Sequence, residues 1–395
     1  MQGRGRRVAI TGFGVVAPCG IGKEAFWAGL NGPGLSSGRS VEILDWDPSP
    51  YFANEKESRR ADRVEQFAVA AAAECFEHAG RPTAEASRFG TIFGTGVGGL
   101  RSIQEQIEVL IAKGERRVSP FLVPMMMPNA SGAAISMRYG LQGPNETICT
   151  ACAASTHAIG YAARLIAWDM IDACVTGGSE SAGCSIGTSS FGNMTALSTS
   201  GHSRPFSPER DGFVLGEGAA AFMLEEWSAA IARGATILGE VVGSASNADA
   251  HHITAPAPGG VGAIACMRQA LKDADLAPAD IRQVNAHGTS TPLNDAAEAA
   301  AIAEVFGAGA VAVTSTKGVT GHALGAAGAL EAAAILLSMQ HRQIPPTAGT
   351  KQLDEGFEID LVMGEARAWE PGPSMSNSLG FGGHNGSIII SPPSA

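Results

Sequence analysis

Charged residues are scarce in this chain of 395 residues: they make up only 16% of it, whereas hydrophobic residues make up 45%. So apolar a composition excludes a disordered or fibrous chain and leaves enough hydrophobic side chain for a substantial core. Long hydrophobic runs are missing too, because none approaches the ~18 residues of a transmembrane helix. The net charge of −11 argues against a protein whose whole surface binds nucleic acid or anionic lipid. We therefore expect a globular protein without a nucleic acid or membrane partner.

Cysteine is sparse and irregularly spaced, at positions 19, 75, 149, 152, 174, 184 and 266. This pattern is neither a disulfide framework nor a pair of zinc-binding motifs, so it indicates reduced thiols in a cytoplasmic protein. The N-terminus is basic and then apolar, like a signal peptide, but glycines interrupt residues 8–17, which favours a buried strand. The adjacent His251 and His252 would face opposite sides of a strand, and no carboxylate cluster completes a ligand set. We predict no metal site.

Strand-like runs alternate with alanine-rich helical patterns along the whole chain. The pattern predicts strands within residues 6–18, 90–99, 172–178, 218–226, 236–246, 281–290, 311–317 and 385–391. It predicts helices over residues 64–79, 128–138, 153–168, 262–275, 294–305 and 323–340. Such alternation is typical of an α/β fold whose sheets are buried on both faces.

A faint internal repeat suggests that the chain is built from two similar halves. CTACAASTHAIGYAARLI resembles VTGHALGAAGALEAAAILL, since each has a reactive side chain, then small residues, then an alanine-rich helix. We predict halves of roughly residues 1–234 and 235–395, with a site at their interface.

Three residues are candidates for chemistry at that interface. Cys152 is followed by small residues that allow a tight turn into a helix, and the N-terminus of a helix favours a thiolate. His287 and His322 each follow a predicted strand, where α/β proteins place their sites. For one such histidine alone, a structural role and a catalytic role are equally expected. Two histidines together with one thiol favour catalysis.

Five motifs give the chain a family resemblance: TACAASTH, RPFSPERDGFVLGEGA, NAHGTSTPLNDAAEA, TSTKGVTGHALGAAGALE and SNSLGFGGHNGS. In this order and spacing they resemble the β-ketoacyl-acyl carrier protein synthases, specifically the elongating type II enzymes of bacterial fatty acid synthesis. The resemblance runs from the first predicted strand to the last. It implies a thiolase-like fold, with five alternating αβαβα layers built from two duplicated halves, and a homodimer.

The resemblance also implies catalytic roles. Cys152 would be the acylated nucleophile, and Cys149 would then be a buried, small hydrophobic residue. The Nε atoms of His287 and His322 would donate to the enolate oxygen that decarboxylation of malonyl thioester creates. The backbone N–H groups of Cys152 and Phe381 would form the oxyanion hole, and the Phe381 ring would act as a gate. Lys317, near His322, and Glu298 would be a charged pair that organises the site. No metal or redox cofactor is implied, because the phosphopantetheine belongs to the acyl carrier protein substrate.

Further residues are implied to bind the substrate and the carrier. Thr289 and Thr291 would bind the amides of the phosphopantetheine arm, Thr254 and Pro256 would line its tunnel, and Val97 would limit the length of the acyl chain. Two basic clusters would dock the acidic acyl carrier protein. The alternative for each cluster is an ordinary solvent-exposed helix face that binds no partner. The docking residues are Lys56, Arg59, Arg60, Arg116 and Arg117.

The implied reaction is a decarboxylative Claisen condensation that yields 3-oxoacyl-acyl carrier protein in fatty acid elongation. A ketosynthase of a type II polyketide pathway, working as a heterodimer, would carry the same cysteine and histidines and remains an alternative. A non-catalytic chain-length-factor subunit is a different class, and it would lack the nucleophile that Cys152 supplies. A biosynthetic thiolase needs a second catalytic cysteine near the C-terminus, but no cysteine follows Cys266.

Overall fold

The computed structural model describes residues 5–36 and 38–394. Its strands are β1 (Val8–Ala17), β2 (Gly20–Ile21), β3 (Phe89–Gly94), β4 (Asn145–Ile148), β5 (Ala173–Glu180), β6 (Gly218–Glu226), β7 (Gly239–Ala248), β8 (Gln283–Asn285), β9 (Ala312–Thr314), β10 (Gln343–Ile344), β11 (Asp360–Leu361), β12 (Arg367–Ala368), β13 (Ser374–Gly380) and β14 (His384–Ser391). Its α-helices are α1 (Lys23–Leu30), α2 (Glu55–Ser58), α3 (Arg63–Ala79), α4 (Leu100–Lys113), α5 (Leu122–Met126), α6 (Ala130–Tyr139), α7 (Ala154–Ala167), α8 (Ser185–Asn193), α9 (Trp227–Ala232), α10 (Val261–Ala274), α11 (Pro292–Phe306), α12 (Lys317–Thr320) and α13 (Ala327–His341).

The strand order repeats within the chain. The main sheet has the order β11-β9-β8-β13-β14-β7-β1-β6-β5-β3-β4, and β2 pairs with β1. Read outward from the middle, β1-β6-β5-β3-β4 corresponds to β7-β14-β13-β8-β9, with the same sequence of antiparallel and then parallel pairs. The two copies meet along β1 and β7, where Ala9 lies opposite Glu240. The predicted duplication is therefore confirmed; the boundary at residues 234 and 235 lies between α9 and β7 and stays a prediction.

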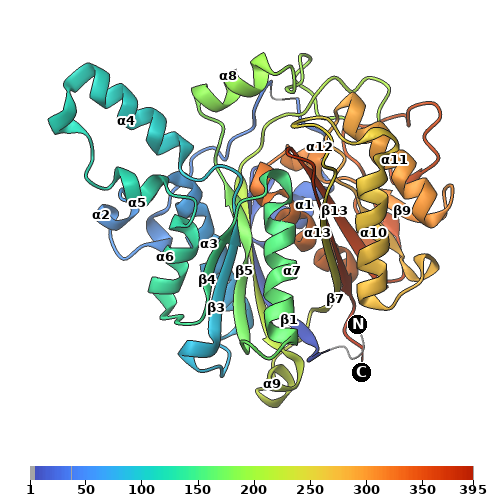
Figure 1. Ribbon diagram of the computed structural model, residues 1–395, viewed down its shortest axis with the longest axis horizontal. Helices are drawn as coiled ribbons and strands as arrows, with labels where there is room; N and C mark the ends of the chain where they lie inside the picture. The colour runs from blue at the N-terminus through green and yellow to red at the C-terminus, as the bar shows by residue number, and fades with distance from the viewer. Residues whose placement is uncertain (1–4, 37, 395) are drawn as a thin grey trace.

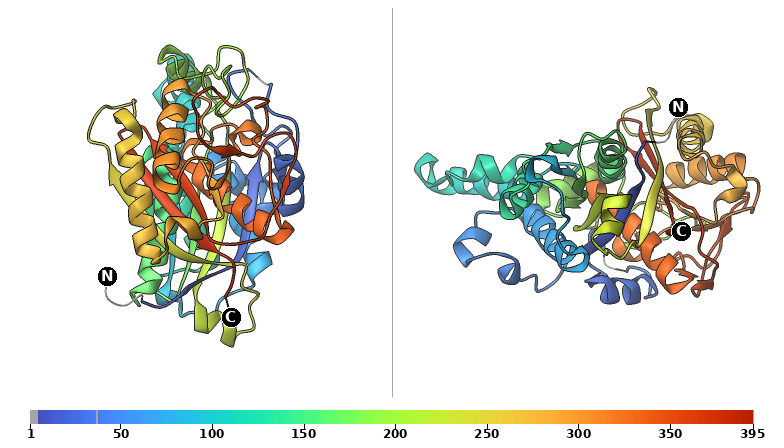
Figure 2. Two further views of the ribbon diagram at one scale, coloured as in Figure 1. Left: turned by 90° about the vertical axis from the view of Figure 1, so that its right-hand side faces the viewer. Right: turned by 90° about the horizontal axis from the view of Figure 1, so that it is seen from below.

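Helices cover both copies of the strand pattern and also fill the space between them (Figure 1). Helices α3 and α6 pack on one outer face, and α10 and α11 lie on the other. Helix α7 contacts strands of both copies and also contacts α13, so these two helices form the middle layer. Seen from below, the layers follow one another across the molecule (Figure 2). The structure confirms the five-layered αβαβα arrangement.

The two central helices are built to be buried. Helix α13 is rich in alanine and leucine, and its residues from Ala327 to Met339 are buried. In α7, a Cβ added at Gly160 would lie 2.9 Å from the Cβ of Ser244, on β7 of the other copy. Glycine is thus needed where the middle layer meets the second half.

One part of the first half projects from the layered body. Helices α2, α4 and α5 lie together on the left of Figure 1, away from α10 and α11. Across the described residues, no helix has the length and apolar character needed to cross a membrane.

Candidate active site

Cys152 lies in the tight turn that joins β4 to α7. A short 3₁₀ helix, η4 (Ala151–Ala153), stands between the two elements, and Ala151 has a φ of 49°, which is unusual for a residue with a side chain. This turn places Cys152 directly before α7, with only 4% of the residue exposed. The neighbouring Cys149 was expected to be buried, but it is exposed, and its thiol donates to the backbone oxygen of Gly96 over 3.2 Å.

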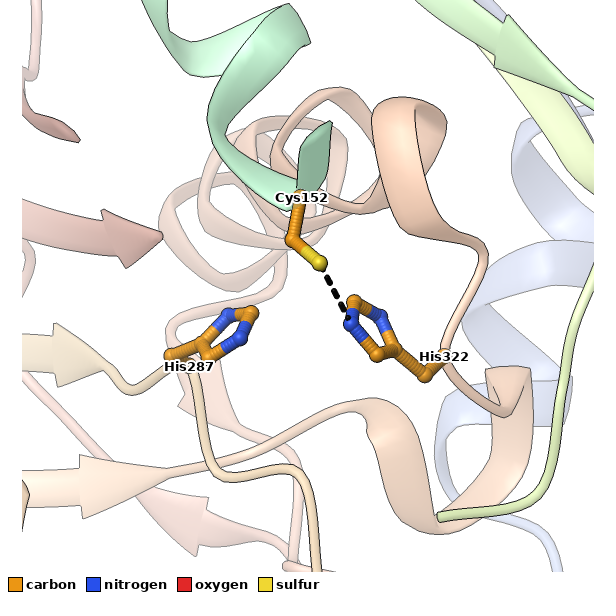
Figure 3. A group of neighbouring side chains, drawn as sticks. All are labelled: Cys152, His287 and His322. Atoms are coloured by element: carbon orange, nitrogen blue, oxygen red, sulfur yellow. Dashed lines mark hydrogen bonds between the residues drawn. The ribbon is translucent and has the colours of Figure 1, made fainter. Parts of the chain in front are cut away.

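The two histidines reach Cys152 from the second half of the chain (Figure 3). His287 follows β8, and His322 follows α12, the short helix after β9. Nε2 of His322 lies 3.0 Å from the Cys152 sulfur, and the two imidazole rings are 5.2 Å apart and nearly perpendicular. The three predicted residues therefore meet at the interface between the halves.

The thiol and both imidazoles are neutral at rest. Burial raises the pKa of Cys152 to about 11, although the Lys317 ammonium and the backbone N–H of Phe381 act in the opposite direction. Burial, with Lys317 nearby, holds the pKa of His287 and of His322 well below the usual value. Desolvation thus outweighs the helix N-terminus and the favourable charges, which act toward a thiolate. The thiol must instead pass its proton to His322 as it reacts.

Lys317 fixes the state of His287. Its Nζ donates to the backbone oxygen of His287 and to Oε1 of Glu331, and it lies 3.4 Å from Nδ1 of His287. An ammonium group can only donate, so Nδ1 is the acceptor and the ring proton lies on Nε2. His287 therefore presents an N–H donor toward Cys152.

The carboxylate partner of Lys317 differs from the prediction. Lys317 pairs with Glu331, and each of the two side chains is only 1% exposed. Glu298 instead accepts from the backbone N–H groups of His287 and Gly288, each over 2.7 Å. Burial raises the pKa of Glu298 and that of Glu331 to about 7. Glu298 thus positions the loop of His287, while Glu331 neutralises the lysine.

Sequence reasoning missed Glu331, although a signal was present. It is the one charged residue in the first part of an apolar helical run, AGALEAAAILLSM, and an unpaired ion there would be costly. That cost predicts a buried partner, which the structure identifies as Lys317.

Phe381 lies in the glycine-rich turn between β13 and β14. Its backbone N–H lowers the pKa of the Cys152 thiol, so this donor group acts where an oxyanion donor is needed. A Cβ added at Gly380 would lie 3.2 Å from the Cys152 nitrogen, so glycine permits this close approach. The Phe381 ring lies 6.5 Å from the ring of Phe191.

A cavity of about 360 Å³ opens onto the three reactive side chains. Its lining includes the predicted substrate residues Thr254, Pro256, Thr289 and Thr291, and also Phe381. The hydroxyls of Thr289 and Thr291 are 2.9 Å apart. Val97 is not among the lining residues, and it is 39% exposed.

The predicted docking residues lie on the projecting part of the first half. Lys56, Arg59, Arg60, Arg116 and Arg117 are all exposed, in and after α2 and in the 3₁₀ helix η3 (Glu115–Arg117). The Arg60 guanidinium lies 4.0 Å from the centre of the Phe121 ring, which brings the two clusters into one region. Arg59 forms an ion pair with Glu55.

Cys152, His287 and His322 also form the one group of potential metal ligands found among the described residues, with ligand atoms within 4.8 Å of one another. Sulfur and imidazole nitrogen are ligands that zinc prefers. The adjacent Lys317 ammonium opposes a cation at this place, however, so the group is better suited to acyl transfer than to metal binding.

Comparison with known proteins agrees with this geometry. The profile of the β-ketoacyl synthase N-terminal domain matches residues 37–230, and that of the C-terminal domain matches residues 238–351. The chain is 41% identical to 3-oxoacyl-(acyl-carrier-protein) synthase 2 of Coxiella burnetii, over 98% of each chain. The crystal structure of a β-ketoacyl synthase from Burkholderia phymatum is similar with a TM-score of 0.91 at 33% identity, covering 98% of this chain and all of the other.

A type II polyketide ketosynthase, AntDE, solved with the acyl carrier protein AntF, is also similar. Its TM-score is 0.89 at 29% identity, and the match covers 99% of this chain and all of the other. The matched profiles, the near-complete coverage and the cysteine and histidine geometry lead to one assignment. The chain belongs to the β-ketoacyl synthase family of acyltransferases.

Proposed function

We propose that the protein catalyses the decarboxylative Claisen condensation of an acyl group on Cys152 with malonyl-acyl carrier protein, giving 3-oxoacyl-acyl carrier protein in fatty acid elongation. The observation that carries this proposal is the meeting of one thiol and two neutral imidazoles in one cavity, with Nε2 of His322 at 3.0 Å from the Cys152 sulfur. The relatives named for fatty acid synthesis support the pathway.

The first step transfers the acyl group to Cys152. The thiol gives its proton to Nε2 of His322 as the sulfur attacks the carbonyl carbon of the acyl-carrier thioester. The carbon–sulfur bond to the carrier then breaks, and the leaving pantetheine sulfur takes the proton from His322. Backbone N–H groups of Cys152 and Phe381 would stabilise the oxyanion of the tetrahedral intermediate.

The second step forms the new carbon–carbon bond. Malonyl thioester loses carbon dioxide, and the electron pair of the broken bond moves toward the thioester oxygen. Nε2–H of His287, held in this tautomer by Lys317, donates to that oxygen. His322 supplies a second donor once its ring proton has moved from Nδ1, where the acylation step leaves it, to Nε2. The enolate carbon attacks the acyl group on Cys152, and the carbon–sulfur bond to Cys152 breaks. The leaving thiolate takes up one proton from water, because the loss of carbon dioxide from the malonyl carboxylate releases none. The mechanism needs no metal or redox cofactor, because the thiol and imidazoles carry both steps.

We also propose a homodimer with acyl carrier protein as substrate partner. A second copy is supported by exposed apolar residues on α4, α5 and α6, where Ile111, Val123 and Met137 are 81%, 57% and 78% exposed. Strand β4, at the edge of the sheet, contacts α6 and has no neighbouring strand on its outer side within the described residues. A cytoplasmic location is supported by the cysteines, all seven of which are free thiols.

A role in a type II polyketide pathway is the second candidate. It is favoured by the likeness to ketosynthases that are described with a chain length factor or with their acyl carrier protein. In that role, the apolar face of α4, α5 and α6 would pack against a different subunit.

The proposed reaction can be tested with the purified chain alone. Incubation with a medium-chain acyl-carrier thioester and malonyl-acyl carrier protein should give a 3-oxoacyl product two carbons longer, detected by mass spectrometry. Cys152→Ala should abolish the acyl-enzyme, whereas the matched Cys149→Ala variant should retain it. An acyl group found on Cys149 alone, or no condensation product from the intact chain, would contradict the proposal.

A further inference from the structure

Glu180 is a fully buried carboxylate near the active site that the mechanism above does not use. It ends strand β5 and has 0% of its surface exposed. Its Oε2 accepts hydrogen bonds from the backbone N–H groups of Gly96 at 2.6 Å and Gly325 at 3.0 Å, and its Oε1 accepts one from the Thr95 hydroxyl at 3.3 Å. No lysine, arginine or histidine among the described residues forms an ion pair with it. Its contacts are therefore hydrogen bonds to two chain segments.

The two segments belong to different halves of the chain. Gly96 lies in the loop that follows β3, and Gly325 lies in the 3₁₀ helix η7 (Leu324–Ala326) between His322 and α13. The segments are in direct contact, since a Cβ added at Gly325 would lie 2.2 Å from the Gly96 nitrogen. One carboxylate oxygen thus joins the backbones of both halves where they touch.

Each segment leads directly to a reactive residue. Leu324 follows His322 by two residues, has the strained φ of 41°, and packs in the same apolar cluster as Cys152. On the other side, the Gly96 oxygen accepts from the thiol of Cys149, which begins the turn that carries Cys152. A shift of η7 against the Gly96 loop would move His322 relative to the nucleophile.

The charge of Glu180 does not explain its presence. Negative charge at this place raises the pKa of the Cys152 thiol, which hinders formation of the nucleophile. Burial raises the pKa of Glu180 itself to about 7, so the carboxylate is also costly to keep ionised. Its benefit must come from the hydrogen bonds that it accepts.

We propose that Glu180 is a positioning residue that holds the turn after His322 against the Gly96 loop and so keeps Nε2 of His322 in line with the Cys152 sulfur. The condensation readout used below rests on the proposed function. The thiol readout does not, because alkylation of Cys152 needs no knowledge of the natural substrate.

Two substitutions separate the hydrogen bonds from the charge. Glu180→Gln and Glu180→Leu remove the same charge and have nearly the same size, but only glutamine keeps an oxygen for the Gly96 and Gly325 N–H groups. Glu180→Gln should condense at close to the parental rate. Glu180→Leu should lose kcat on the order of tenfold to a hundredfold, with little change in KM, because misplacement of a catalytic group impairs chemistry. Alkylation of Cys152 by iodoacetamide should likewise be slower in the leucine variant than in the glutamine variant.

Glu225 supplies the structural control. It is 2% exposed, bonds Arg233, and lies opposite Ala173, at the other end of β5 from Glu180. Glu225→Leu should lower the melting temperature more than Glu225→Gln, yet both should alkylate Cys152 as the parent does.

Three results would overturn the positioning role. The first is an equal loss of condensation and alkylation rate in Glu180→Gln and Glu180→Leu. The second is a parental rate of both reactions in Glu180→Leu. The third is a loss of rate in Glu180→Leu that Glu225→Leu reproduces at the same melting temperature. If the parent itself fails to condense, the proposed function fails, while the alkylation rates still decide the role of Glu180.

Discussion

Replacing Lys317 by methionine should damage stability and catalysis in separable ways. Lys317 and Glu331 form an ion pair in which each side chain is only 1% exposed. The substitution removes the cation but keeps a side chain of similar length, so the carboxylate of Glu331 stays buried without its partner. Lys317→Met also removes the donor that holds the ring proton of His287 on Nε2.

The magnitudes follow from these two contacts. Removing one partner of a buried ion pair costs about 3–5 kcal/mol of the free energy of unfolding. Glu331, whose pKa is already raised to about 7, relieves part of this cost by taking up a proton. When folding raises the pKa of a carboxyl group, the protein loses stability as pH rises from the pKa of the unfolded state, near 4.5, through the pKa of the folded state. The loss in the free energy of unfolding that Lys317→Met causes should therefore be larger at pH 8 than at pH 6.

Catalysis should fall for a different reason. Without a fixed Nε2–H, His287 loses its role as donor to the enolate, and one such donor accounts for about 3 kcal/mol, or about a hundredfold in kcat. Acylation of Cys152, which depends on His322, should be much less affected. The double variant Lys317→Met/Glu331→Gln removes the unpaired carboxylate, so it should regain stability without regaining decarboxylation.

The assays are urea unfolding at both pH values and the release of carbon dioxide from malonyl thioester. Lys272→Met is the matched control, because Lys272 is exposed on α10 and should affect neither measurement. Decarboxylation at the parental rate in Lys317→Met, or its recovery in the double variant, would refute the argument that Lys317 sets the state of His287.

Three other outcomes test further parts of the site. Alkylation of Cys152 by iodoacetamide should keep accelerating as pH rises from 7 to 9, because burial raises the thiol pKa to about 11; a plateau across this range would indicate a thiolate at rest. Reversing Arg59, Arg60, Arg116 and Arg117 to Glu should raise KM for carrier-bound substrates and flatten its salt dependence, while acylation from a small thioester is unchanged; equal losses with both substrates would reject docking. The family resemblance predicts that Val97→Phe shortens the acyl chains that are accepted; because Val97 is absent from the lining of the cavity, an unchanged chain-length preference would show that it does not bound the acyl site.

The sequence predicted the elements that carry a strong apolar pattern. The helix expected over residues 64–79 is α3, and the strand expected over residues 218–226 is β6. Strand β13 was missed because its sequence, SMSNSLG, is rich in serine and asparagine, although most of it is buried. Its polar side chains bond to partners from distant elements, such as Ser378 to Thr156 on α7. Edge strand β4, NETI, is short and partly exposed, so it carries no apolar signal.

The chemistry-bearing residues were predictable, but their partners were not. Cys152, His287 and His322 stand in recognisable motifs, and the structure brings them together. Which carboxylate meets Lys317 depends on how α13 packs against the loop of His287, and this is set by tertiary structure. Glu331 and Glu180 are both separated in sequence from the atoms that they bind, and their burial appears only in the folded chain.

The most direct test of the proposed mechanism compares His287→Ala with His322→Ala. The family resemblance assigns both histidines to the enolate oxygen, so by itself it predicts that both variants spare acylation. The contact of 3.0 Å between His322 and the Cys152 thiol changes this prediction for His322. Formation of the acyl-enzyme is measured by intact-protein mass spectrometry, and carbon dioxide release from malonyl thioester is measured in parallel. His287→Ala should acylate at close to the parental rate but fail to decarboxylate, whereas His322→Ala should be slow in both steps. Parental decarboxylation by His287→Ala, or parental acylation by His322→Ala, would contradict the roles given to the two histidines.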